Sequence, residues 1–130
     1  MTRILRLIAA LIVSAAAAAP AMAGSATPVG QWEQTTGQAR YSVVACGKGG
    51  DLLCAKLVWI APSERTSENM SKLNTYVVRG AAAVSGNKWT GNVVLDGRTY
   101  EGTMTLVSRN YMKLKGCAGI LCQTFEFTRI

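Results

Sequence analysis

After about its first two dozen residues, the chain alternates between apolar and polar positions with a period of two, and no stretch keeps the 3.6-residue period of an amphipathic helix. The clearest example is residues 100–106, where Tyr100, Met104 and Leu106 share one face and polar side chains occupy the other. This alternation is typical of a strand with one buried face and one solvated face. The pattern therefore predicts an all-β protein.

Eight such segments follow one another along the chain. They cover residues 29–34, 40–46, 53–60, 75–84, 88–95, 100–106, 111–116 and 122–129. The segment 75–84 is the least regular, because three consecutive alanines form strands poorly, and a helical or irregular path stays open there.

Turn signals join these segments in sequence. Asp96-Gly97 is the strongest two-residue hairpin signal in the chain. Residues 62–74 form the longest polar stretch and predict a loop, with one helical turn over residues 67–73. Neighbouring strands joined in this way predict a small antiparallel up-and-down β-barrel of about eight strands, because closure removes the exposed sheet edges. An open or two-sheet sandwich is the alternative.

The interior of an eight-stranded barrel is just wide enough for its own side chains or for one small ligand. Bulky apolar residues of the predicted strands are the candidates to line it: Leu57, Trp59, Trp89, Met104, Leu114, Phe125 and Phe127. They either fill the interior as an ordinary core or surround a small apolar or amphiphilic molecule.

Residues 1–23 have the organisation of an export signal. Two arginines precede a run of apolar and small residues, which ends in Ala-Met-Ala at residues 21–23. The run is shorter than the roughly 18–20 residues that a membrane-spanning helix needs. We therefore expect cleavage of the signal peptide, a single domain over residues 24–130, and a periplasmic location, with secretion as the alternative.

The four cysteines all lie beyond this signal, at Cys46, Cys54, Cys117 and Cys122. An even number of cysteines in an oxidising compartment predicts two disulfides. Sequence order favours pairing the first with the second and the third with the fourth, because each pair brackets a short turn that contains glycine. The other two pairings remain open, and a four-cysteine zinc site is disfavoured because neither pair has the C-x-x-C spacing.

Histidine is absent from the chain. Its absence excludes Ser/His/Asp and Cys/His triads, histidine-bound zinc and the commonest general base at neutral pH. Glu101 and Glu126 are the one carboxylate pair that acid/base chemistry would use, and both face solvent in the predicted register. We therefore expect neither an enzyme nor a metal or other cofactor.

The charge balance is moderately basic, with 14 basic and 7 acidic residues and a net charge of +7. Removing the two arginines of the signal leaves a net charge of +5. Lysines and arginines are scattered rather than clustered, which indicates a solvated surface with weak attraction to anionic envelope material. Nucleic acid is not an expected partner.

A set of short motifs spread along the chain resembles a known family. In order, they are Gly30-x-Trp32, Leu53-Cys54-Ala55-Lys56-Leu57-Val58-Trp59, Lys88-Trp89-Thr90-Gly91, Asp96-Gly97-x-Thr99-Tyr100, Leu114-Lys115-Gly116-Cys117 and Glu126-Phe127-Thr128-Arg129. Their order and spacing resemble a family of small exported bacterial proteins catalogued as domain of unknown function 2147. The family looks like a relative of the lipocalin and fatty-acid-binding barrels, which implies a closed lipocalin-like barrel and supplies no catalytic residues.

The resemblance also implies a role for Trp32 and Arg129. Lipocalin-like barrels commonly carry a G-x-W on the first strand, whose indole closes the barrel floor against a basic residue of the last strand. Such a cation–π contact contributes about 0.5–2 kcal/mol. Gly30-x-Trp32 and Arg129 occupy these places, although an ordinary core tryptophan and a terminal surface charge remain the alternative.

Two functions are compatible with these features. The first is a binding module that holds a small apolar or amphiphilic envelope molecule inside the barrel. The alternative is a protein-interaction module, such as an envelope-stress protein or a cell-wall-hydrolase inhibitor, which presents the loop 62–74 and the turn 117–122 to a periplasmic partner. A cavity of several hundred cubic ångströms favours the first and a filled interior favours the second; the oligomeric state is left open.

Overall fold

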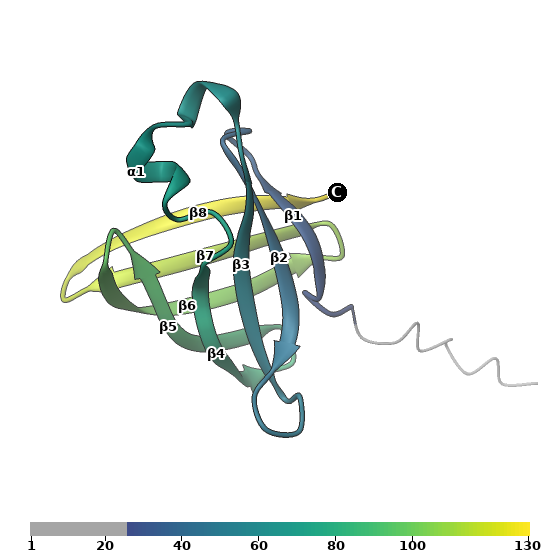
Figure 1. Cartoon of the computed structure of the whole chain (residues 1–130). Coiled ribbons are helices and arrows are strands. Elements are labelled where there is room, and N and C mark those ends of the chain that lie inside the picture. The colour runs from purple at the N-terminus through teal and green to yellow at the C-terminus, as the bar shows by residue number, and fades with distance from the viewer. Residues whose placement is uncertain (1–25) are drawn as a thin grey trace, which may run out of the picture.

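The strands of a closed antiparallel barrel contain most of residues 26–130, the part of the chain that the computed structural model describes. The predicted signal peptide over residues 1–23 lies outside these residues. Each strand pairs with the next in sequence, and the last pairs with the first (Figure 1). The strands are β1 (Gly30–Gln34), β2 (Ala39–Cys46), β3 (Leu52–Ile60), β4 (Tyr76–Ser85), β5 (Lys88–Leu95), β6 (Arg98–Ser108), β7 (Tyr111–Ala118) and β8 (Leu121–Arg129). The predicted up-and-down barrel is confirmed, and the sandwich is excluded.

The predicted turn chemistry is also confirmed. Leu95 pairs directly with Arg98, so that Asp96 and Gly97 form a two-residue turn with φ values of 50° and 75°. Positive φ at both central residues matches the twist of the flanking strands, which is why Asp-Gly is favoured there. The sequence pattern therefore places this hairpin correctly.

Residues 61–75, which we call the lid, form the longest connection and join β3 to β4. The lid contains a short 3₁₀ helix, η1 (Pro62–Glu64), and one α-helical turn, α1 (Ser67–Met70). The Thr66 side chain accepts a hydrogen bond of 3.1 Å from the backbone N–H of Asn69, which satisfies a donor that the helix start would leave free. The predicted loop with one helical turn is thus present, although α1 is shorter than expected.

Strand β4 forms despite its three consecutive alanines, and the first of them, Ala81, packs closely against β5. Ala81 is buried, and a Cβ atom added to the neighbouring Gly91 would lie 2.7 Å from its Cα atom. A Cβ atom on Gly102, which pairs with Gly91, would lie 2.2 Å from a methyl carbon of Val93. Small side chains therefore permit the close approach that bends the sheet into a barrel.

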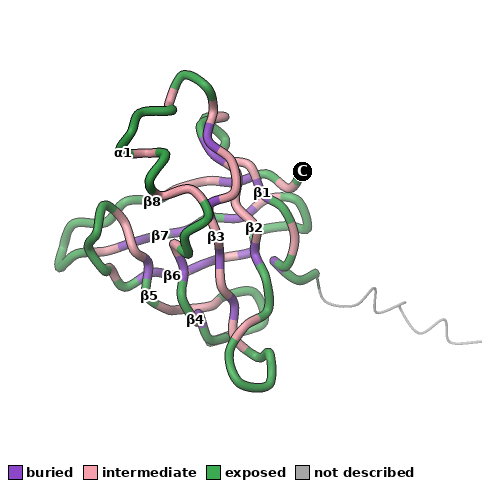
Figure 2. The backbone as a smooth tube through the Cα atoms, viewed as in Figure 1, coloured by how far each residue is buried: buried purple, intermediate pink, exposed green. Residues whose placement is uncertain are grey.

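Buried side chains lie on the inner face of the barrel, and along β3, β6 and β7 they alternate with more exposed ones (Figure 2). The main core cluster consists of Trp32, Val43, Leu53, Ala55, Val78, Ala81, Val93, Met104, Leu106, Met112, Leu114 and Phe127. A smaller cluster of Ala39, Leu57 and Ile60 lies beneath the lid. Across residues 26–130, none of the helices has the length and apolar character needed to cross a membrane.

Two disulfides tie neighbouring strands together. Cys46–Cys54 joins β2 to β3, and Cys117–Cys122 joins β7 to β8 next to their turn. The favoured pairing is confirmed. Because all four cysteines are oxidised, none offers a thiolate to zinc, and the four-cysteine site is excluded.

Candidate functional site

The two ends of the barrel differ, and each is named here by its connections. The closed end carries the β2–β3, β4–β5 and β6–β7 turns, and the mouth carries the β1–β2, β5–β6 and β7–β8 turns together with the lid. Trp32 lies toward the closed end, fully buried, and its indole Nε1–H donates a 2.8 Å hydrogen bond to the carbonyl of Pro28. The guanidinium carbon of Arg129 lies 4.3 Å from the centre of its ring. The structure thus brings together the predicted closure pair.

Arg129 also donates hydrogen bonds to three backbone carbonyls in two segments at this end. Its Nε donates to the carbonyl of Arg109 at 2.8 Å, its Nη1 to Val29 at 2.9 Å and its Nη2 to Thr27 at 2.7 Å. The Gly30 of the G-x-W motif leaves room for this side chain, because an added Cβ atom would lie 2.6 Å from Nη1. Gly30 also has a φ of 144°, which side-chain-bearing residues rarely adopt. The motif therefore seals the closed end.

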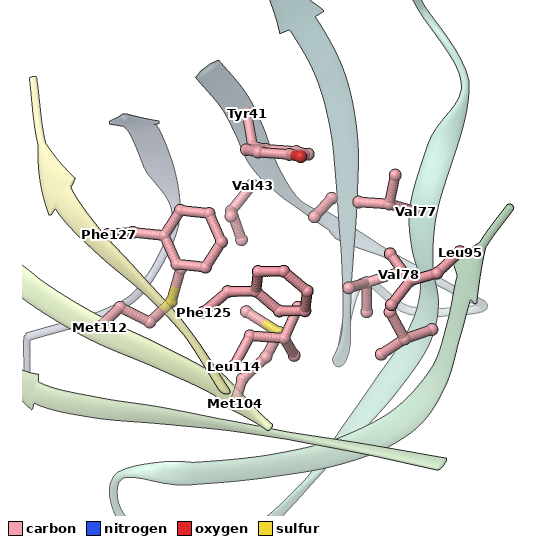
Figure 3. Close-up of a pocket in the computed structure, with 12 residues that line it drawn as sticks. Tyr41, Val43, Val77, Val78, Leu95, Met104, Met112, Leu114, Phe125 and Phe127 are labelled. Carbon is pink, nitrogen blue, oxygen red and sulfur yellow. The ribbon is translucent and has the colours of Figure 1, made fainter. Parts of the chain in front are cut away.

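The interior above this seal is almost filled. An apolar chamber of about 40 Å³ lies between the strands, and Figure 3 shows the side chains that point into it. It is lined by Tyr41, Val43, Ala55, Val77, Val78, Val93, Leu95, Met104, Met112, Leu114, Phe125 and Phe127. A single water molecule needs a cavity of about 10–15 Å³, so the chamber could hold only a few waters and is far too small for a ligand on its own.

A much larger cavity lies at the mouth, beneath the lid, with a volume of about 410 Å³. Tyr41, Val77 and Leu95 line both this mouth cavity and the chamber, so the two are adjoining spaces. The mouth cavity is lined by these three residues and by Gln34, Gln38, Ala39, Leu57, Ile60, Glu64, Asn69, Lys72, Thr75, Tyr76, Arg79, Val94, Asp96 and Gly97. Apolar side chains thus meet polar and charged side chains around one open space.

Tyr41 stands at the boundary between the chamber and the mouth cavity. Its ring packs edge-on against Phe127, with 5.5 Å between the ring centres, and Figure 3 shows its phenol extending from β2 toward Val77. Burial raises the pKa of the Tyr41 hydroxyl, which therefore stays protonated at neutral pH. The boundary thus carries a neutral hydroxyl group in apolar surroundings.

The lid is fixed to the barrel at its C-terminal part. Leu73 packs against Leu57 and Ile60, which belong to the smaller apolar cluster. The backbone N–H of Asn74 donates to the carbonyl of Leu57 at 2.7 Å, and the N–H of Leu57 donates to the carbonyl of Thr75 at 3.0 Å. This anchorage holds the rest of the lid over the mouth cavity.

An exposed ion pair connects the lid to the β5–β6 turn. The Lys72 Nζ donates a hydrogen bond to the carboxylate of Asp96, and both residues line the mouth cavity. This hydrogen bond and the attraction between the charges lower the pKa of Asp96, and the same hydrogen bond raises the pKa of Lys72. The pair therefore links the two sides of the cavity rim at neutral pH.

The predicted lining residues separate into three groups. Met104, Leu114, Phe125 and Phe127 line the chamber, and Leu57 lines the mouth cavity. Trp89 packs against the main core cluster and lines neither space.

Trp59 is a correction to the sequence analysis, because it points away from the interior. Tyr41 pairs with Leu57 and Arg40 pairs with Trp59, which leaves Val58 as an extra residue in β3. This bulge shifts the alternation by one, so that the outer face of the barrel receives Trp59. The guanidinium of Arg40 lies 4.2 Å from the centre of the Trp59 ring.

Several residues that build the cavities were absent from the predicted set. Tyr41 and Leu95 lie on the predicted strands 40–46 and 88–95, in alternation with the buried Val43 and Val93, so the two-residue period contained this signal. Val77 carries no such signal. Its neighbour Val78 also faces inward, because the β3–β4 register shifts in this region.

Comparison with known proteins identifies the family to which the chain belongs. The family model described as "Uncharacterized protein conserved in bacteria (DUF2147)" matches residues 30–129. This range runs from the glycine of the G-x-W motif to the closing arginine. No curated protein and no solved structure matches the chain.

Proposed function

The chain belongs to the DUF2147 family of uncharacterized proteins conserved in bacteria, and we propose that it is a non-enzymatic binding module for a small apolar or amphiphilic envelope molecule. The observation that carries this proposal is the mouth cavity of about 410 Å³. Pockets that hold small molecules have volumes of roughly 300–1,000 Å³ and combine apolar walls with a few polar groups. The mouth cavity meets both conditions, whereas the chamber meets neither the size nor the polarity.

The lining favours an amphiphilic occupant over a purely apolar one. Leu57, Ile60 and Leu95 offer apolar surface to a hydrocarbon group. The Tyr41 hydroxyl is in position to donate a hydrogen bond to a polar atom that reaches the boundary with the chamber. At the rim, Lys72 and the other polar side chains would surround a head group that remains partly in water.

The chamber gives the site a way to adapt to longer ligands. Met104 and Met112 both line it, and methionine side chains repack more readily than branched ones. A hydrocarbon group that enters past Tyr41 would displace these thioethers at modest cost. The expected occupant is therefore a molecule with one slender apolar arm.

Two disulfides support an exported location, in the periplasm or in the medium, because such bonds persist in oxidising compartments. A small envelope molecule is accordingly the expected partner. The nearly filled interior favours a protein-interaction role through the loop 62–74 and the turn 117–122, and that role stays as the alternative. We favour the ligand because the mouth cavity of about 410 Å³ has the size that a small molecule needs.

The proposal is tested by filling the mouth cavity. Ala39 faces this space, and Ala39→Trp places an indole in it. We expect the wild-type protein to enhance the fluorescence of the apolar dye N-phenyl-1-naphthylamine, and the variant to lose at least about tenfold in dye affinity. Native mass spectrometry after incubation with envelope lipid extract gives a second measurement on the same pair.

The matched control is Val44→Trp, on the same strand but on the outer face, where the side chain is 38% exposed. This variant adds the same indole outside the cavity and should bind dye like the wild type. Absence of dye enhancement by the wild type, or equal affinity in Ala39→Trp with the fold retained by circular dichroism, would refute the proposed site.

A further inference from the structure

The most exposed apolar side chains of the described residues lie together at the tip of the β7–β8 hairpin. Ile120 is 99% exposed and Leu121 is 76% exposed. Figure 2 shows this turn as an exposed loop that projects from the barrel. An exposed large apolar pair of this kind commonly marks an interaction site.

The hairpin holds this pair in a fixed position. The Cys117–Cys122 disulfide closes the hairpin beside the turn, with 4.1 Å between the Cα atoms. Ala118 pairs with Leu121, so Gly119 and Ile120 form a two-residue turn. The apolar pair is therefore presented on a short, stapled hairpin instead of a flexible loop, and little order has to be imposed when it binds.

Two exposed basic side chains lie near the tip, Lys115 on the outer face of β7 and Arg98 at the mouth end of β6, where it pairs with Leu95. The β6–β7 register pairs Glu101 with Cys117. Arg98 lies three residues farther toward the mouth, which is the end of the barrel that carries the tip. Within residues 26–130, neither cation takes part in an ion pair.

We propose that this tip, Ile120 and Leu121 with Arg98 and Lys115, docks the protein on the surface of an anionic phospholipid bilayer. Apolar side chains that enter the boundary between head groups and acyl chains, together with nearby cations, are what binding to an anionic bilayer requires. A protein partner is less favoured, because a stable protein interface covers about 800 Å² on each side, far more than two side chains offer.

Docking in this way would also position the mouth cavity. Asp96 and Gly97 line that cavity, and Arg98 follows them directly in the chain. A bilayer in contact with the tip and Arg98 therefore lies next to the mouth and away from the closed end. The docking surface itself does not depend on the proposed ligand site, since none of its four residues lines the cavity.

Vesicle flotation tests the proposal with purified protein and vesicles of equimolar phosphatidylcholine and phosphatidylglycerol. The variant Ile120→Ser/Leu121→Ser should lose about tenfold or more in vesicle affinity, because it removes the apolar part of the contact. The variant Arg98→Gln/Lys115→Gln should bind weakly at low salt and show a smaller dependence on salt. Every protein compared begins at Gly24, after the expected signal peptide, so that the apolar segment of residues 1–23 does not itself bind the vesicles.

The matched control is Val84→Ser/Val107→Ser, which removes two exposed apolar side chains at the closed end and should bind vesicles like the wild type. Ala39→Trp should also bind like the wild type, which separates this proposal from the ligand site. The proposal is overturned if the wild type does not float with the vesicles, or if the serine variant of the tip binds them equally well. Capture of a protein by the tip in the absence of vesicle binding would likewise overturn it.

Discussion

The closed end and the mouth of this barrel use polar groups in opposite ways. At the closed end, the Arg129 guanidinium packs on one indole ring and donates hydrogen bonds to three backbone carbonyls. At the mouth, Lys72 and Asp96 form an exposed pair beside a cavity of about 410 Å³. Satisfied groups packed against a ring stabilise a fold, whereas accessible groups around a void remain available to a ligand. We therefore propose that the closed end stabilises the fold and that the mouth binds the ligand.

The division predicts that changes at the closed end act on stability. Trp32→Ala should have the largest effect, lowering the free energy of unfolding by about 3–5 kcal/mol, because it leaves a cavity where a fully buried indole packs. Urea denaturation followed by circular dichroism measures it. A loss below about 1 kcal/mol would show that the seal does not support the fold.

Arg129→Met should have the next largest effect. The substitution keeps much of the apolar stem but removes the three hydrogen bonds to carbonyls and the cation–π contact, so we expect a loss of about 2–3 kcal/mol in the same measurement. Arg109→Met removes an exposed arginine nearby and should change stability by less than about 0.5 kcal/mol. Equal effects of the two variants would contradict the role of Arg129.

Tyr41→Phe tests whether the mouth acts on ligand binding and not on stability. Removing only the hydroxyl at the boundary of the mouth cavity should change the free energy of unfolding by less than about 1 kcal/mol, because the packing of its ring against Phe127 remains. Affinity for amphiphiles with a hydrogen-bond acceptor should fall, while affinity for N-phenyl-1-naphthylamine should stay unchanged. Isothermal titration with a matched pair of ligands, alcohol and alkane, distinguishes these outcomes.

Asp96→Asn should have the smallest effect on stability, within about 0.5 kcal/mol, because the ion pair is exposed. It should instead speed dye entry, since the lid loses its link to the β5–β6 turn. The pKa of Asp96 is lowered from 3.8, so the link is present above that value and is lost as the pH falls through the pKa of the folded state. The pKa of Lys72 is raised from 10.5, so the link is also lost as the pH rises through that higher pKa.

Stopped-flow dye binding across pH checks this prediction. The wild type and Asp96→Asn should differ near neutral pH and converge in strong acid, where the wild-type carboxylate becomes protonated. Identical entry rates at neutral pH would show that the pair does not restrain the lid.

The fold could be predicted closely because most strands carry a two-residue alternation and the turn at Asp96-Gly97 has a clear sequence signal, whereas β4 carries no regular alternation. The seal could be predicted from the resemblance of Gly30-x-Trp32 and Arg129 to a known arrangement. The orientation of Trp59 could not, because the bulge at Val58 depends on how β2 pairs with β3. The mouth cavity could not be predicted either, because its volume depends on where the lid packs. The lid packs through Leu73 against Leu57 and Ile60, and the sequence pattern does not show this contact.

The most direct test of this division is an NMR titration of the protein with N-phenyl-1-naphthylamine. Chemical-shift changes should concentrate at the mouth, at Ala39, Leu57 and Leu95, while the indole N–H signal of Trp32 stays in place because its hydrogen bond to Pro28 is sealed from the ligand. Shifts centred on Trp32, or none at the mouth at saturating dye, would contradict the account.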